Sequence, residues 1–305
     1  MQIPTSPTFL RLFILISFGF LTALTACTST SSGKQTSSPQ QSGGDKIEII
    51  VDSCDSEHFT TLSTEAKTTM MEAGITKCSM PFGILIGADQ NIDDTYVLKV
   101  AQIVAEMLDQ DRNGSADDTA LQIELQQWNR AWLAMPANQQ TWETTQLPLL
   151  YQHLGYDIIV PTWWMGSGQG EPDTRAIQVM VEEVTHFITQ FGWSSVYPEQ
   201  FGVNNWSSVI AQETQSAQCD WWQHPENDCP DSPAEYPGEC NAPSCDVVEF
   251  YHQVLIMRAG MTPGWLGIGF PETKEELEEK LSQQIKDIMD DPQYHQLKQP
   301  LQFDY

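Results

Sequence analysis

Basic residues are scarce in this chain: 14 Lys and Arg stand against 41 Asp and Glu, which gives a formal net charge of -27. A surface so poor in positive charge repels the phosphate backbone, so we expect no nucleic-acid partner. The excess of carboxylates suits divalent cations or a saline exterior, and it equally suits a solvated acidic surface that aids solubility. Charge alone does not decide between these explanations.

Long apolar runs are also absent after residue 24, so we expect no transmembrane helix there. Neither a Pro/Gly-rich break nor an internal repeat divides residues 46–305, which predicts a single domain. Residues 28–45 consist almost entirely of Ser, Thr, Gln, Gly and Pro and lack apolar side chains that could favour a packed structure. We interpret this stretch as a flexible tether.

The N-terminus has the pattern of an exported, lipid-anchored protein. Residues 12–24 are almost wholly apolar and follow a short segment with one basic residue, Arg11, as in a signal peptide. Residues 24–27 (LTAC) resemble the lipobox of bacterial lipoproteins. The resemblance implies that residues 1–26 are removed and that Cys27 carries the lipid. We therefore expect an anchor in the bacterial cell envelope, at the outer membrane or cell surface, and a protein or peptide ligand is compatible with that location.

Besides Cys27 there are six cysteines, and their spacing lacks the C-x-x-C pairs that zinc knuckles favour. An even number of cysteines in an exported protein predicts three disulfides, with a zinc knuckle as the alternative. Cys54 and Cys78 are the expected N-terminal pair. The other four lie in a loop over residues 219–245, and the sequence leaves their pairing open: Cys219, Cys229, Cys240 and Cys245.

The hydrophobic pattern predicts an α+β fold, predominantly helical with a small sheet. The expected strands cover residues 47–51, 82–88 and 156–161. The expected helices begin near Asp93, Asp118, Asp173, Asp246 and Pro271. The second of them carries an apolar stripe that extends to Trp132.

A loop between the first two expected helices resembles the calcium loop of EF-hand proteins, over residues 109–120. It reads DQDRNGSAD over its first nine positions, with oxygen-bearing side chains at positions 1, 3, 5 and 9 and glycine at position 6. The calcium ligands that this resemblance implies are Asp109, Asp111, Asn113, Ser115 and Asp117. At position 12 Ala120 replaces the usual glutamate, so Asp118 or Glu124 would have to substitute. A metal-free turn between two helices is the alternative.

Residues 182–186 (EEVTH), on the third expected helix, resemble the H-E-x-x-H helix of zincin metallopeptidases. In that family two histidines one turn apart bind zinc and the glutamate activates water. The resemblance implies that Glu183 is the general base, that His186 is a zinc ligand, and that Glu182 replaces the first histidine as a carboxylate ligand. A solvated polar helix face is the alternative.

The fourth expected helix is apolar nearly all round, which predicts burial, yet it carries Glu249 and His252 side by side. Burying ionisable groups without partners costs on the order of several kcal/mol, so this pair needs a partner. In the gluzincin branch of the zincins the third ligand is a glutamate on a later helix, a role that the resemblance gives to Glu249, with His252 as an alternative ligand. Ion pairs to Arg175 or Arg258 are the competing explanation.

Three functional hypotheses follow. The first is a metal-dependent, peptidase-like hydrolase with a zinc site and a calcium-stabilised fold. The second is a non-catalytic, calcium-stabilised surface binding lipoprotein with a degenerate zincin-like site. The third is a ferritin-like di-metal protein, because two E-x-x-H helices occur, although Glu106 and Glu124 both precede them. The order of elements also resembles a group of uncharacterised secreted proteins, which implies no activity.

Overall fold

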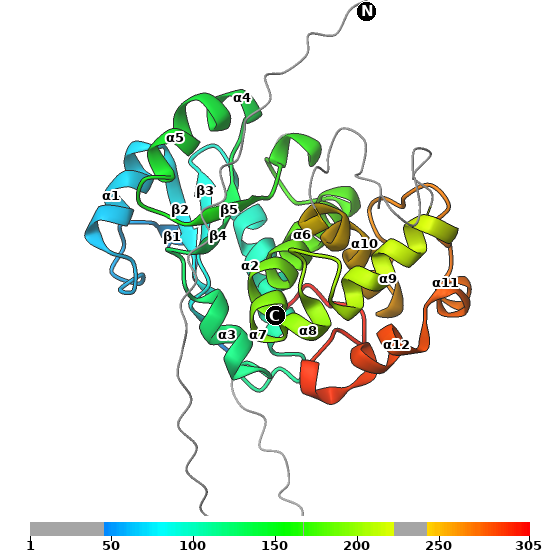
Figure 1. Cartoon of the computed structure of the whole chain (residues 1–305). Coiled ribbons are helices and arrows are strands. Elements are labelled where there is room, and N and C mark those ends of the chain that lie inside the picture. The colour runs from blue at the N-terminus through cyan, green and yellow to red at the C-terminus, as the bar shows by residue number, and fades with distance from the viewer. Residues whose placement is uncertain (1–45, 167, 223–242) are drawn as a thin grey trace, which may run out of the picture. The chain divides into compact units, whose positions relative to one another are not determined.

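A mixed sheet forms the N-terminal half of the folded body in the computed structural model, which describes residues 46–166, 168–222 and 243–305 (Figure 1). The described residues hold one five-stranded sheet in the order β1-β2-β3-β4-β5. Its strands are β1 (Asp52–Ser53), β2 (Ile75–Ser79), β3 (Ile86–Asp89), β4 (Ala131–Met135) and β5 (Tyr156–Ile159). Strand β2 pairs antiparallel with both β1 and β3, whereas β4 pairs parallel with both β3 and β5.

Helices connect the parallel strands and make up most of the rest, which confirms the predicted α+β class. The helices are α1 (Thr64–Glu72), α2 (Asp94–Leu108), α3 (Thr119–Leu125), α4 (Gln139–Thr141), α5 (Leu147–Leu150), α6 (Thr174–Phe187), α7 (Ser194–Val196), α8 (Pro198–Phe201), α9 (Val209–Asp220), α10 (Pro243–Arg258), α11 (Lys274–Lys280) and α12 (Gln283–Asp290). Short 3-10 turns cover Pro81–Gly83, Thr162–Trp164 and Pro292–Tyr294, and π-helical turns cover Trp142–Gln146 and Ile188–Trp193.

The predicted helix starts agree best with the observed ones where an aspartate side chain caps the helix. The Asp118 carboxylate accepts from the Ala120 and Leu121 amides, and the Asp173 carboxylate accepts from the Ala176 amide. The second helix is nevertheless shorter than expected, because it ends at Leu125 and Trp132 lies in β4. Pro271 does not open α11; the helix begins after Thr273, whose side chain accepts from the Glu276 amide.

The predicted strands need two corrections. Residues 47–51 are not a strand, since pairing with β2 begins only at Asp52. Phe82 and Gly83 have positive φ values of 51° and 82°, so the chain turns after Pro81 and β3 begins only at Ile86. The sequence analysis missed β2 and β4, whose residues carry no strict alternation of apolar and polar side chains.

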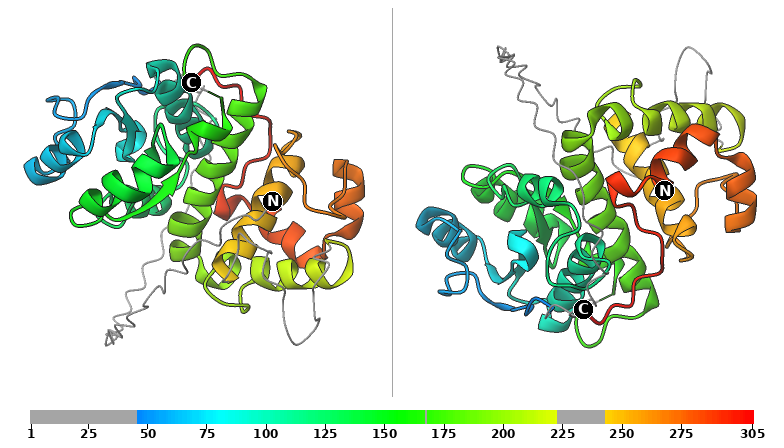
Figure 2. Two further views of the ribbon diagram at one scale, coloured as in Figure 1. Left: turned by 90° about the horizontal axis from the view of Figure 1, so that it is seen from above. Right: turned by 90° about the horizontal axis from the view of Figure 1, so that it is seen from below.

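The sheet separates two apolar cores. Along β4, Ala131, Leu133 and Met135 pack into the larger core, whereas Trp132 and Ala134 pack into the smaller one. The smaller core lies against α1 and includes Trp142, and the larger core holds the buried faces of α2, α6, α9 and α10. Helix α6 contacts β4 and β5 on one side and α10 on another, so it joins the sheet to the helical half (Figure 2).

Disulfides occur as predicted in the N-terminal region. Cys54 and Cys78 are bonded across a sequence separation of 24 residues. Cys219 and Cys245 each take part in a disulfide as well. Cys229 and Cys240 lie outside the described residues, so the pairing in the 219–245 loop stays open.

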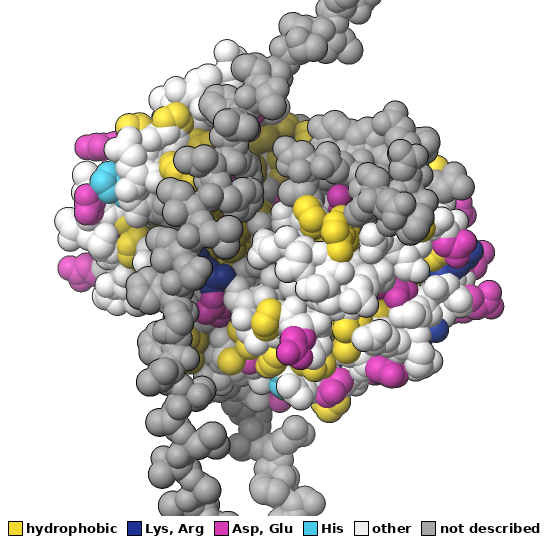
Figure 3. Space-filling model, in the orientation of Figure 1, with side chains coloured by type: hydrophobic (Ala, Val, Ile, Leu, Met, Phe, Trp, Pro, Cys, Tyr) yellow, Lys and Arg dark blue, Asp and Glu magenta, His cyan; other side chains and the backbone are white. Residues whose placement is uncertain are grey.

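Acidic side chains are scattered over the face shown in Figure 3, with few Lys or Arg among them. Among the described residues, no helix combines the length and the apolar character needed to cross a membrane. The predicted signal peptide, the lipidated Cys27 and the tether fall outside the described residues. Gly43–Tyr305 groups into one compact unit.

Candidate metal centre

Helix α6 carries the EEVTH segment toward α10 rather than toward solvent. The apolar residues Met180, Val184 and Phe187 bury one side of the helix. His186 is only 6% exposed, so the alternative of a solvated polar face is wrong for this residue. Glu182 and His186 are four residues apart and are therefore neighbours on the helix surface.

Helix α10 is buried, as its composition predicts, and it places Glu249 and His252 opposite α6. His252 is 1% exposed, and the Glu249 side chain is 19% exposed. Arg258, the competing partner for these groups, instead contacts Glu278 at 2.7 Å and Asp290 at 3.2 Å. The ionisable pair on α10 therefore faces the ionisable pair on α6.

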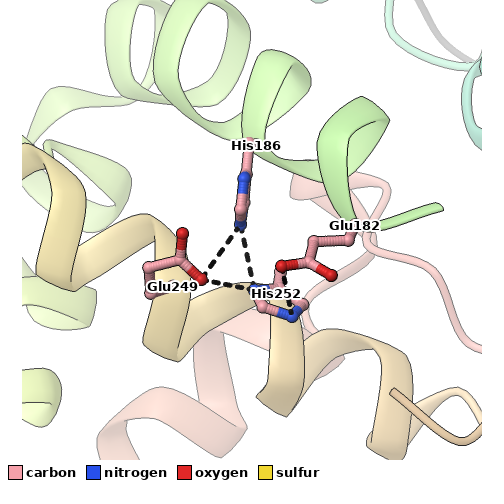
Figure 4. Close-up of side chains that lie close together, drawn as sticks. All are labelled: Glu182, His186, Glu249 and His252. Atoms are coloured by element: carbon pink, nitrogen blue, oxygen red, sulfur yellow. Dashed lines mark hydrogen bonds and ion pairs between the residues drawn. The ribbon is translucent and has the colours of Figure 1, made fainter. Parts of the chain in front are cut away.

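The four side chains converge on one volume between the helices (Figure 4). His186 Nε2 lies 3.0 Å from His252 Nδ1, and Glu249 Oε2 lies 3.7 Å from each of these nitrogens. A triangle with these sides has a point about 2.0 Å from all three atoms, which is the length of zinc bonds to imidazole nitrogen and carboxylate oxygen. Glu182 completes the group, because one donor atom from each of the four residues lies within 4.8 Å of the others.

His252 presents both of its ring nitrogens to the cluster. Its Nε2 atom is buried and has no hydrogen-bond partner, and it lies 4.0 Å from Glu182 Oε1. Leaving a buried polar atom unsatisfied costs roughly 1–3 kcal/mol, so such atoms usually have a function. The ring thus offers Nδ1 toward His186 and Glu249, and Nε2 toward Glu182.

Burial favours the neutral forms of His252 and Glu183. Burial, with the nearby His186 ring as a second cause, lowers the pKa of His252 well below 6.5, although hydrogen bonds to the backbone of Val248 and Glu249 oppose the shift. A neutral imidazole with a free lone pair is the form that binds metals. Burial also raises the pKa of the Glu183 carboxyl to about 8.

Glu183 stands apart from the four converging residues. Its Oε2 lies 3.3 Å from His186 Nδ1, on the side of the ring away from the Nε2 atom that faces His252. A carboxylate in that position fixes the tautomer and orientation of a metal-binding histidine. The general-base role of Glu183 stays a prediction.

A cavity of about 500 Å³ adjoins the cluster, and Glu182 and His252 both form part of its wall. The remaining wall comes from α6, from α10, from residues 261–264 and from Phe303 near the C-terminus. The cluster therefore lies at the end of a space large enough for a small molecule.

The acidic loop forms a second group that could hold a cation, consisting of Asp109, Asp111 and Asp117. Asp109 is fully buried, and its carboxylate accepts from the Asn113 and Gly114 amides at 2.9 and 2.8 Å. The Asn113 side chain donates to the Asp111 carboxylate at 2.8 Å and accepts from the Ser115 amide at 2.9 Å, so it lies beside this group. Coordination of a cation by Asn113 and Ser115 stays a prediction.

Both candidate substitutes for the missing position-12 ligand have other partners. Asp118 uses one carboxylate oxygen to cap α3 and the other to accept from the Tyr197 hydroxyl. Glu124 forms an ion pair with Arg130. The sequence analysis missed Tyr305, whose hydroxyl donates to Asp109 from the far end of the chain.

The structure does not assemble the residues of the ferritin-like alternative. Glu106 accepts from the amides of Gln302 and Asp304 and pairs with Arg112, and it is not one of the residues of the α6–α10 cluster. Glu124 is paired with Arg130. In the part of the chain that the structure describes, the His-containing group draws its donors from α6 and α10 alone.

Comparison of the chain with protein-family models, with curated proteins and with solved structures finds no match.

Proposed function

We propose that the chain is a metalloprotein that binds one zinc ion between α6 and α10 and uses it in hydrolysis. The convergence of Glu182, His186, Glu249 and His252 between the two helices carries this proposal. Two imidazoles with carboxylates suit zinc better than calcium or magnesium. Bound zinc supplies a Lewis acid and lowers the pKa of a coordinated water, which are the requirements of peptidase-like chemistry.

The positions of these residues support a separate role for each one. His186, His252 and Glu249 hold the ion, and Glu183 holds the His186 ring through Nδ1. Glu182 lies at the cavity wall, where it can accept a proton or hold a substrate group. The Asp109 loop, with carboxylates and no imidazole, suits a calcium ion that stabilises the fold.

Zinc analysis of the full-length protein, purified without metal-affinity resin, tests the proposal. We expect about one zinc per chain, because three protein ligands are the usual minimum of a catalytic zinc site. His186→Ala and Glu249→Ala should each lose the metal. His58→Ala is the matched control, since that histidine is exposed and pairs with Asp52 at a distance of 2.9 Å from the ring. Zinc that is absent from the wild type, or retained in both variants, contradicts the proposal.

A non-catalytic role is the second candidate, and Glu182 is the observation that favours it. Structural zinc sites have four protein ligands, whereas catalytic sites keep one position open for water or substrate. If Glu182 coordinates together with the other three residues, the site is closed and the protein is a binding lipoprotein. Cobalt substitution separates the cases: Glu182→Ala changes the visible spectrum of the cobalt protein only if Glu182 is a ligand.

A further inference from the structure

The cavity beside the metal centre is built from one continuous stripe of α6. Thr174, Ile177, Gln178, Val181 and Glu182 line it, and their spacing of three and four residues places them on one helix face. Ile177 and Val181 are the apolar members of the stripe, and Glu182 lies at its C-terminal end. A molecule that lies along it has one end at the metal centre.

The other walls are equally poor in charge. Ile256 follows His252 by one turn of α10, and Met261, Pro263 and Phe303 close the opposite side. Among the described residues that line the cavity, the ionisable side chains are Glu182 and His252, and no Lys or Arg is present. A carboxylate or phosphate on a ligand would have no cation to pair with away from the metal centre, and it would face an acidic protein.

The cavity is also large enough to hold more than a single aliphatic side chain of a ligand. Its volume of about 500 Å³ lies within the range of small-molecule sites, which are mostly apolar with a few polar groups at one end. Glu182 and His252 supply such polar groups, and the Gln178 amide, which donates to the Thr262 carbonyl, ties the rim to α6.

We propose that this cavity binds the uncharged apolar part of a substrate, such as an acyl chain or a large apolar side chain, with the bond to be hydrolysed held at Glu182 and His252. The proposal rests on the function proposed above, since it places the reacting end of the substrate at the zinc centre. It excludes substrates with an anionic group in the cavity.

Two hydroxamates of different chain length test it, with binding to zinc-loaded full-length protein measured by calorimetry. Acetohydroxamate offers only the metal-binding head, whereas octanohydroxamate adds an apolar chain. Each buried methylene contributes about 0.8 kcal/mol, or roughly fourfold in affinity, so octanohydroxamate should bind at least about 100-fold more tightly. Ile177→Gln should remove at least about tenfold of this advantage.

Ile123→Gln is the matched control, because Ile123 is 59% exposed on α3 and does not line the cavity. It should keep the full chain-length advantage. Equal affinity for both hydroxamates overturns the cavity proposal and leaves the zinc centre intact. If neither binds although zinc is present, the cavity proposal is wrong as well. If the protein holds no zinc, the proposed function fails first. Octanohydroxamate that binds equally well to metal-free protein overturns the placement of the reacting bond at the centre.

Discussion

Glu183 is the residue for which the structure differs most from the role that the sequence motif implies. The motif suggests a group that faces the metal, yet its oxygen lies at the Nδ1 atom of His186. Partners in this position typically account for 10–100-fold in metal affinity or activity. We therefore expect substitution of Glu183 to act first on the orientation of the His186 ring rather than on a direct contact with substrate.

We expect Glu183→Gln to retain zinc with an affinity about 10–100-fold lower, because the amide replaces one of the two carboxyl oxygens with an NH2 group and so weakens the contact that orients the His186 ring. Competition with a zinc chelator measures the change. Glu171→Gln, at an exposed position before α6, is the control and should bind zinc as the wild type does. An unaltered affinity in Glu183→Gln would show that the contact does not support the centre.

Helix α2 and the C-terminal segment depend on each other through one buried carboxylate. Glu106 is 4% exposed and accepts from the amides of Gln302 and Asp304, at 2.5 and 3.0 Å, while Arg112 lies 3.0 Å away. The C-terminal segment also carries Phe303 into the cavity wall. Glu106 thus helps to hold the segment that forms one side of the cavity, together with Lys99 of the same helix, which donates to the Phe303 carbonyl at 2.7 Å.

Glu106→Ala should lower the free energy of unfolding by about 3 kcal/mol, because it leaves two amides and a guanidinium without their buried acceptor. Urea denaturation followed by tryptophan fluorescence measures the loss. Glu279→Ala, at an exposed position on α11, is the matched control and should change stability by less than about 0.5 kcal/mol. Similar losses in both variants would show that the Glu106 contacts contribute little.

The acidic loop joins α2 to α3, and a cation bound there stabilises the native state by mass action. Calcium at about 100 times its dissociation constant should add about 2.7 kcal/mol, or roughly 5 °C in thermal midpoint. Asp109→Ala combined with Asp111→Ala should abolish the shift. Because Asp109 also accepts from loop amides, the double variant should be less stable even without calcium.

Asp55→Ala controls for general loss of a carboxylate, since Asp55 is exposed and outside the loop group. It should keep the full calcium response. A wild-type midpoint that does not move in millimolar calcium would mean that the loop is a turn without a metal.

At the scale of the whole molecule, the envelope anchor is the prediction that depends least on the fold. Cys27→Ala removes the sulfur that would carry the lipid, so the protein should leave the membrane fraction and partition into the aqueous phase of a detergent separation. Processing should also lose its sensitivity to globomycin. The Cys54–Cys78 disulfide offers a control, because Cys54→Ala combined with Cys78→Ala should alter stability and leave membrane partitioning unchanged. Membrane association that survives in Cys27→Ala contradicts the anchor.

The sequence by itself determined the local features of this protein. Aspartate caps fixed the starts of α3 and α6, and apolar periodicity predicted the buried faces of α2 and α6. Apolar composition predicted the burial of α10, and spacing placed Glu249 beside His252. These features depend on residues a few positions apart, and backbone geometry relates such residues without reference to the rest of the chain.

Only the tertiary structure decided which distant residues meet. His186 and His252 are 66 residues apart and come within 3.0 Å because α6 packs on α10. Tyr305 reaches Asp109 across 196 residues because Glu106 holds the C-terminal segment. Strand β4 escaped prediction because burial on both faces removes the alternation that marks a half-exposed strand. Strand β2 escaped because its residues, ITKCS, place two polar side chains in succession and do not alternate. Contacts of this kind depend on how whole elements pack, which no local pattern encodes.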